Sequence, residues 1–162
     1  VPAWIRANLQ VDDDPLHWAV AGLSNGGTCA MQAVTRSPGT FRTFLAISAE
    51  EHPTLGSVER TISRGFGGDR AAYEANDPLS LMAAAPPGRY EGIAGILSVG
   101  RQDERYLGAV PVLAEAATRA GMTVATRQYD GGHTWAVWGA ALADQVDWLG
   151  GRLGITRPRP AS

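Results

Sequence analysis

The sequence predicts an α/β fold in which a mainly parallel sheet of about four strands carries helices on both faces. Short, continuous apolar runs, typical of strands buried on both faces, alternate with segments whose apolar residues recur every three or four positions. The 162 residues are 44% hydrophobic and 19% charged, which suits one domain with a real core. Alternation of this kind is typical of parallel sheets that helices cover.

The first half of the chain contributes two of the expected strands. Residues 1–9 predict a helix, because three apolar side chains share one face. A short apolar run over 18–21 predicts a buried strand, and 26–37 predicts a helix that the Ser-Pro-Gly sequence stops. A second buried strand is expected over 44–47.

The second half repeats the alternation after a long segment rich in Gly and Pro. Within 50–87 we expect short helices and loops, with helices over 70–75 and 79–84 as examples. Residues 93–153 then predict, in order, a strand over 93–99, a helix that ends at Gly121, a strand over 123–129 and an amphipathic helix over 135–153. We expect the domain to occupy 1–154 and a flexible Arg/Pro tail to occupy 155–162.

Composition excludes several classes of function. A net charge of -2 and a pI of about 5.9 argue against a nucleic-acid partner, which usually meets a basic surface. No apolar run approaches the roughly 20 residues of a membrane span. Cys29 is the single cysteine, so it excludes an internal disulfide, and we expect it to be a small buried apolar residue. All Lys and Arg positions are arginine, so mechanisms that need a lysine nucleophile, a Schiff base or a P-loop lysine are excluded.

The first predicted strand runs into a G-x-S-x-G motif formed by Gly22, Ser24 and Gly26, followed by Gly27. In a strand–turn–helix context, this motif places a nucleophilic serine on a strained turn. We expect the turn to leave no room for side chains two residues before and after the serine. The N–H group of Asn25, at the start of the helix, would stabilise an oxyanion. The alternative is a plain glycine-rich turn with Ser24 as a helix N-cap.

A carboxylate follows the third predicted strand and is the candidate acid. Asp103 is preferred, because an acid there could orient a histidine, and Glu104 beside it is the alternative. Glu50 and Glu51 follow the second strand and are further alternatives. The alternative without a catalytic role is that Asp103 is an ordinary solvated acid of a loop, paired with a nearby arginine.

The candidate base follows the fourth predicted strand. His133 comes after two glycines that allow a sharp bend, and it directly precedes the last helix. A histidine there could take a proton from Ser24 and return it to a leaving group. His17 lies before the serine strand, at the wrong end of the sheet. His52 follows the second strand and is a weaker alternative for the base. The chain order Ser24, Asp103, His133 is the one expected of an α/β-hydrolase.

Three stretches carry a resemblance to a known family. Residues 18–49 (WAVAGLSNGGTCAMQAVTRSPGTFRTFLAISA) resemble the serine-turn region of the esterase D, feruloyl-esterase and antigen 85 branch of α/β-hydrolases. The FGGD sequence at 66–69 with NDPL at 76–79 resembles a segment of those esterases. HTWAVWGA at 133–140 is similar to their histidine loop and final helix, and its W-x-x-W-G-A part leans toward the mycolyltransferase-like antigen 85 proteins.

The resemblance implies roles for residues in this sequence. Ser24 would be the nucleophile, His133 the base and Asp103 the acid, with Glu104 open because antigen 85-like members use a glutamate. The resemblance implies no metal and no cofactor. It favours an extracytoplasmic or cell-envelope location.

The resemblance also implies that this chain is the C-terminal half of an α/β-hydrolase fold. The family's earlier strands, which supply a second oxyanion N–H group, have no counterpart here. We therefore expect the missing N-terminal half or a second chain to cover the sheet edge. We also expect the 162-residue chain alone to be a poor catalyst, which robust ester hydrolysis by the purified monomer would refute.

The sequence thus predicts a serine carboxylic-ester hydrolase that acts on an ester or acyl substrate through an acyl-enzyme. One alternative is an acyltransferase that moves the acyl group to a sugar hydroxyl, and another is a non-catalytic hydrolase-like binding module. A peptidase with the same three residues is a further possibility. Trp135 is a candidate lining residue of an acyl or sugar pocket.

Overall fold

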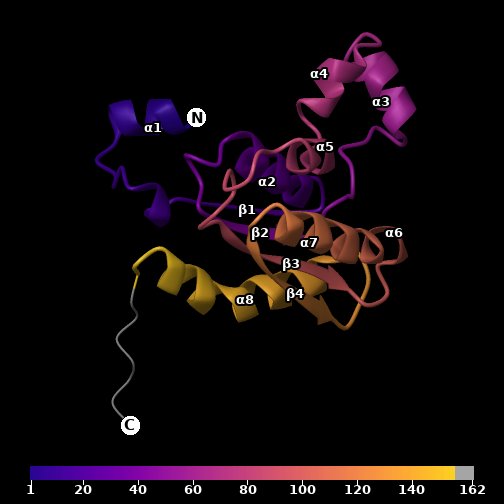
Figure 1. The fold of residues 1–162 in the computed structure, drawn as a ribbon. Coiled ribbons are helices and arrows are strands. Elements are labelled where there is room, and N and C mark those ends of the chain that lie inside the picture. The colour runs from indigo at the N-terminus through magenta and orange to yellow at the C-terminus, as the bar shows by residue number, and fades with distance from the viewer. Residues whose placement is uncertain (156–162) are drawn as a thin grey trace.

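A four-stranded parallel sheet forms the centre of the computed structural model, which describes residues 1–155 (Figure 1). Its strands lie in the order β1-β2-β3-β4, and every neighbouring pair is parallel. The strands are β1 (Ala19–Leu23), β2 (Thr43–Ile47), β3 (Ala94–Gly100) and β4 (Thr123–Tyr129). The predicted parallel sheet of about four strands is confirmed.

Helices cover both faces of this sheet. Helices α2 (Asn25–Arg36) and α7 (Ala109–Arg119) pack on one face, and α8 (Trp135–Arg152) packs on the other (Figure 1). The alternation of β2 explains the two layers: Phe44 and Ala46 belong to the core under α2 and α7, whereas Ile47 packs with α8. The predicted helices on both faces are confirmed.

The segment between β2 and β3 is built from short capped helices. These are α3 (Val58–Gly65), α4 (Arg70–Glu74) and α5 (Pro78–Ala83). The side chains of Ser57, Asp69 and Asp77 accept a backbone N–H at their respective N-termini. Helices α3 and α4 project away from the sheet, while α5 lies beside α2 (Figure 1). The expected short helices are present: α4 and α5 match the two ranges given from the sequence, and α3 is a further short helix whose range was not specified.

The N-terminal segment contains α1 (Pro2–Asn8) and a 3₁₀ turn over Pro15–His17. Neither element has a buried residue, and Trp4 is 62% exposed. Arg6 links α1 to the start of the sheet, because its guanidinium lies 4.7 Å from the Trp18 ring. The helix expected at the N-terminus is therefore present, but its apolar face is largely open to solvent.

Two burial expectations are wrong. The first strand begins at Ala19 and is only half-buried, with Ala21 exposed, because β1 lies at a sheet edge. Cys29 is exposed rather than buried, because α2 turns Ala30 and Met31 toward the core. The tail expected over 155–162 lies outside the described residues, apart from Ile155.

The buried side of α8 differs from its apolar stripe. Leu142 and Val146 are exposed, whereas Gln145 is almost fully buried. The Gln145 amide donates hydrogen bonds to Ser98 Oγ at 3.0 Å and to the Tyr129 hydroxyl at 3.1 Å. These polar contacts, together with packing against Ile47, set which side of α8 faces the sheet. Within residues 1–155, no helix is both long and apolar enough to cross a membrane.

Candidate active site

Ser24 lies on a sharp turn between β1 and α2. Its φ of 55° and ψ of -125° fall in a region that non-glycine residues rarely adopt, at a cost of ~1–3 kcal/mol. The turn is held on both sides: the Ser24 N–H donates to the Ile47 carbonyl at 2.8 Å, and the Ser24 carbonyl accepts from Gly27 N–H at 2.9 Å. The strain therefore presents the hydroxyl at the carboxyl edge of the sheet, just before the N-terminus of α2.

The glycines around Ser24 are required to different degrees. A Cβ atom on Gly22 would lie 2.0 Å from the Gly26 carbonyl oxygen, and one on Gly27 would lie 2.7 Å from the Ile47 carbonyl oxygen. A Cβ atom on Gly26 would meet nothing within 4 Å. The expectation that the residues two before and two after the serine both lack room is thus wrong for Gly26, because α2 carries that position outward. Gly27 is the second position with no room.

The structure brings Ser24, His133 and Asp103 together from the ends of three strands. Ser24 Oγ lies 2.8 Å from His133 Nε2, and His133 Nδ1 lies 2.8 Å from Asp103 Oδ2. A carboxylate accepts only, so Nδ1 carries the proton and Nε2 is left to accept the hydrogen bond of the Ser24 hydroxyl. This is the protonation state in which an imidazole can act as a base toward serine.

Asp103 is the acid that contacts His133 among the described residues. Its side chain is 3% exposed, and the N–H groups of Tyr106 and Leu107 in α6 (Glu104–Leu107) donate to its main-chain carbonyl. Glu104 is exposed on the first turn of α6 and lines a separate cavity with Arg105. Glu50 accepts from Arg105, and Glu51 lies near His52. The three alternative acids therefore face other partners.

The loops that carry Asp103 and His133 interlock. The Gln102 N–H donates to the Gly131 carbonyl at 3.0 Å, and the Gly131 N–H donates back to the Gln102 side-chain oxygen. Gly100 allows this approach, because a Cβ atom there would lie 2.3 Å from the Gly131 oxygen. Sequence reasoning missed the part played by Gln102, since no local pattern pairs it with a loop some thirty residues away.

Aromatic rings surround the imidazole of His133. The Tyr106 ring stacks on it, with centroids 4.3 Å apart and planes 14° apart. The Trp138 ring meets it edge-on at 4.8 Å, and the Trp138 N–H donates to Ser48 Oγ at 3.3 Å. Trp135 contacts Trp138, with ring centroids 5.0 Å apart, but is 75% exposed, so most of its side chain faces solvent. Tyr106 was not singled out from the sequence.

Comparison with known proteins identifies the family of the chain. The Esterase family model matches residues 1–149. The chain belongs to the Esterase family. An uncharacterized protein of Corynebacterium glutamicum is 37% identical to this esterase-family chain over 158 residues, which are 96% of the chain and 37% of that protein.

Solved structures share the fold of this esterase-family chain. A ferulic acid esterase superposes with a TM-score of 0.74 at 25% identity, over 94% of the chain and 58% of that structure. An S-formylglutathione hydrolase from Agrobacterium tumefaciens gives a TM-score of 0.74 at 24% identity, over 94% of the chain and 55% of that structure. The chain therefore spans little more than half of these α/β-hydrolases. The resemblance to the esterase D and feruloyl-esterase branch is confirmed, and the lean toward antigen 85 stays a prediction.

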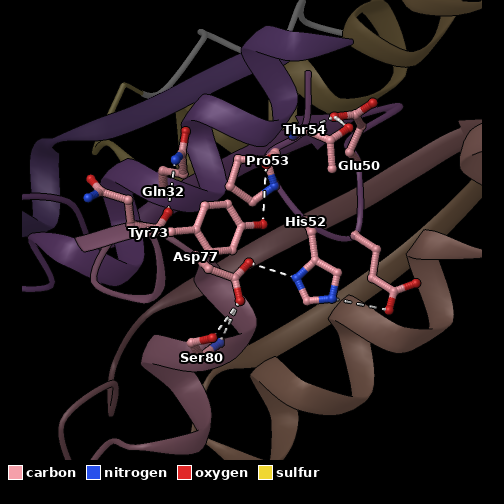
Figure 2. Close-up of polar contacts among 10 residues, drawn as sticks. Gln32, Glu50, His52, Pro53, Thr54, Tyr73, Asp77 and Ser80 are labelled. Carbon is pink, nitrogen blue, oxygen red and sulfur yellow. Dashed lines mark hydrogen bonds and ion pairs between the residues drawn. The ribbon is translucent and has the colours of Figure 1, made fainter. Parts of the chain in front are cut away.

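The other two histidines of this esterase-family chain lie in separate contacts. His17 Nδ1 lies 2.5 Å from an Asp12 carboxylate oxygen near the N-terminus. His52 Nδ1 lies 2.9 Å from Asp77 Oδ1, and Asp77 accepts two further hydrogen bonds from Ser80 (Figure 2). Asp77 is 1% exposed. His52 thus ties the segment after β2 to the start of α5 instead of joining Ser24.

Two tyrosine side chains of the described residues have a raised pKa. Burial raises the pKa of Tyr73 to about 12, and the carboxylates of Asp77 and Glu50 add to the increase. The Tyr73 hydroxyl donates to the Pro53 carbonyl (Figure 2). Burial also raises the pKa of Tyr129. Both phenols therefore stay neutral well above neutral pH and serve as hydrogen-bond partners.

Proposed function

We propose that this chain carries the nucleophile, base and acid of a serine carboxylic-ester hydrolase. The observation that carries the proposal is the continuous hydrogen-bonded series from Ser24 through His133 to the buried carboxylate of Asp103. Membership of the Esterase family supports an ester as the substrate. The strained backbone of Ser24 supports a chemical role, because such strain persists where the surroundings hold a functional group in place.

The first step forms an acyl-enzyme. Ser24 Oγ attacks the ester carbonyl while His133 Nε2 accepts the hydroxyl proton, and Asp103 stabilises the resulting imidazolium. The negative charge that develops on the carbonyl oxygen is met by the N–H of Asn25, the first residue of α2. His133 then returns its proton to the alcohol as the C–O bond breaks. A water molecule reverses the sequence and releases the acid.

The second oxyanion donor and much of the acyl cleft are proposed to come from polypeptide beyond these 162 residues. The support is the coverage: the chain spans 58% of the ferulic acid esterase and 55% of the S-formylglutathione hydrolase. Two donors at a tetrahedral intermediate are each worth roughly 10²–10³ in rate. Activity is therefore best measured on the protein as its gene encodes it.

Labelling with a fluorophosphonate probe tests the proposal. The probe reacts only with an activated serine, so we expect one label, located at Ser24 by mass spectrometry. Ser24→Ala and His133→Ala should both abolish it, whereas Cys29→Ser, a change to an exposed side chain on the same helix, should leave it intact. A folded protein that stays unlabelled, or that is labelled elsewhere, overturns the proposed function.

Replacing Trp135 tests whether this exposed side chain contacts the substrate. The side chain is 75% exposed, so Trp135→Ala should change the free energy of unfolding by less than about 0.5 kcal/mol. If the indole binds the acyl or alcohol part of an ester, KM for an aromatic ester should rise severalfold with little change in kcat. Steady-state kinetics with phenyl and methyl esters measure KM and kcat for an aromatic and a small substrate. An unchanged KM for both would remove Trp135 from the pocket.

A further inference from the structure

The two hydrogen bonds of His133 leave one degree of freedom unfixed. Contacts from Nδ1 to Asp103 and from Nε2 to Ser24 lie in the plane of the imidazole, so they fix its direction more than its tilt. The tilt is determined by what lies against the ring face. Tyr106 stacks there at 4.3 Å and 14°, and Tyr106 itself is only 7% exposed.

Tyr106 is held in place by a charged pair. The Arg105 guanidinium lies 5.2 Å from the centroid of the Tyr106 ring and forms an ion pair with Glu50. The Glu50 side chain is 10% exposed, and its second carboxylate oxygen accepts from the N–H and hydroxyl of Thr54 (Figure 2). The Glu50 N–H donates to the hydroxyl of Thr28 at 2.9 Å. These contacts connect Tyr106, through Arg105 and Glu50, to Thr28 on α2, the helix that follows Ser24.

We infer that Tyr106 is a positioning residue that sets the tilt of the His133 ring, and that the Glu50–Arg105 pair holds Tyr106 against it. This inference rests on the proposed function, because it assigns a role within the same site. A misplacement of about 1 Å in a reacting group can lower a rate by roughly 10²-fold, so loss of the stacked ring has a measurable effect. The aromatic face, and not the hydroxyl, makes the contact.

The test compares Tyr106→Phe with Tyr106→Leu in the protein as its gene encodes it. Phenylalanine keeps the ring, so kcat for p-nitrophenyl acetate should stay within about twofold. Leucine removes the ring, so kcat should fall by about 10- to 100-fold with KM changed less than about twofold. In NMR spectra, the His133 ring protons should shift downfield in the leucine variant, because they lose the shielding of the stacked ring, and should stay in place in the phenylalanine variant.

The ion pair is tested with Glu50→Gln, which keeps the shape and removes the charge. Its kcat should fall by roughly threefold to tenfold, and the His133 ring protons should shift in the same direction as in Tyr106→Leu. Arg101→Gln is the matched control: Arg101 is exposed and pairs with Asp130, so both readouts should stay unchanged.

The outcomes separate this inference from the proposed function. A protein with no label at Ser24 refutes the function, while the NMR comparison still decides whether Tyr106 sets the ring. The inference is overturned if the enzyme is labelled and active and Tyr106→Leu leaves kcat unchanged, or changes KM alone. If the leucine variant does not fold, unchanged His133 signals in Glu50→Gln, or a large loss of kcat in Tyr106→Phe, overturn it equally.

Discussion

Replacement of Asp103 by asparagine is expected to lower kcat for ester hydrolysis by about 10⁴-fold, the loss seen when the equivalent acid of a serine protease is changed in this way. The reason is the direction of the hydrogen bond. An asparagine amide can donate to His133 Nδ1, which moves the ring proton to Nε2, and Nε2 then cannot accept from the Ser24 hydroxyl. The geometry of the site would survive, so KM should change little.

Glu104→Gln is the matched control for this prediction. Glu104 is the neighbouring acid in sequence but is exposed, so its kcat should remain within about threefold of the starting protein. Steady-state kinetics of both variants, with circular dichroism to confirm folding, decide between the two acids. A large loss in Glu104→Gln together with a small one in Asp103→Asn would reverse the assignment.

Gly22→Ala is expected to destabilise the fold by more than about 4 kcal/mol, a loss large enough to prevent accumulation of folded protein. The added methyl group would lie 2.0 Å from the Gly26 carbonyl oxygen, which is part of the rigid backbone of the Ser24 turn. Relief of that overlap requires the turn to open, and the turn is where β1 passes into α2. No side chain can move aside to accommodate it.

Gly26→Ala tests the same motif at a position with room. Its methyl group would meet nothing within 4 Å, and alanine favours a helix over glycine by up to about 1 kcal/mol. We therefore expect unchanged or slightly increased stability in urea unfolding, with fluorophosphonate labelling retained. Equal destabilisation by the two substitutions would contradict the packing described around Ser24.

Much of the fold could be predicted because local sequence patterns, such as apolar runs and the positions of glycines, depend directly on it. The apolar run over 44–47 is buried on both faces, so its residues are hydrophobic without alternation, and the structure places β2 there. Ser24 was found for the same reason: the turn requires glycine within three residues of it. The order of strands along the chain then allowed Asp103 and His133 to be selected, because parallel strands place their carboxyl ends at one edge.

What sequence reasoning missed depends on contacts between distant segments. Tyr106 looks like an ordinary apolar residue of a short helix, and its stacking on His133 depends on how two loops meet. The apolar periodicity of α8 includes Leu142 and Val146, but the hydrogen bonds of Gln145 to Ser98 on β3 and Tyr129 on β4 set the buried side. The exposure of Cys29 depends likewise on which face of α2 meets the sheet.

The two hydrogen bonds of His133 also differ in how much of the chain must be ordered before each can form. Asp103 and His133 are 30 residues apart, across a single β3–α7–β4 unit, whereas Ser24 and His133 are 109 residues apart. For an unstructured chain, closing the longer loop costs about 1 kcal/mol more. Asp103 and His133 therefore belong to one compact segment of the chain, and Ser24 joins them only when β1 has paired with the rest of the sheet. Local opening at the β1 edge would separate Ser24 from an Asp103–His133 pair that stays intact.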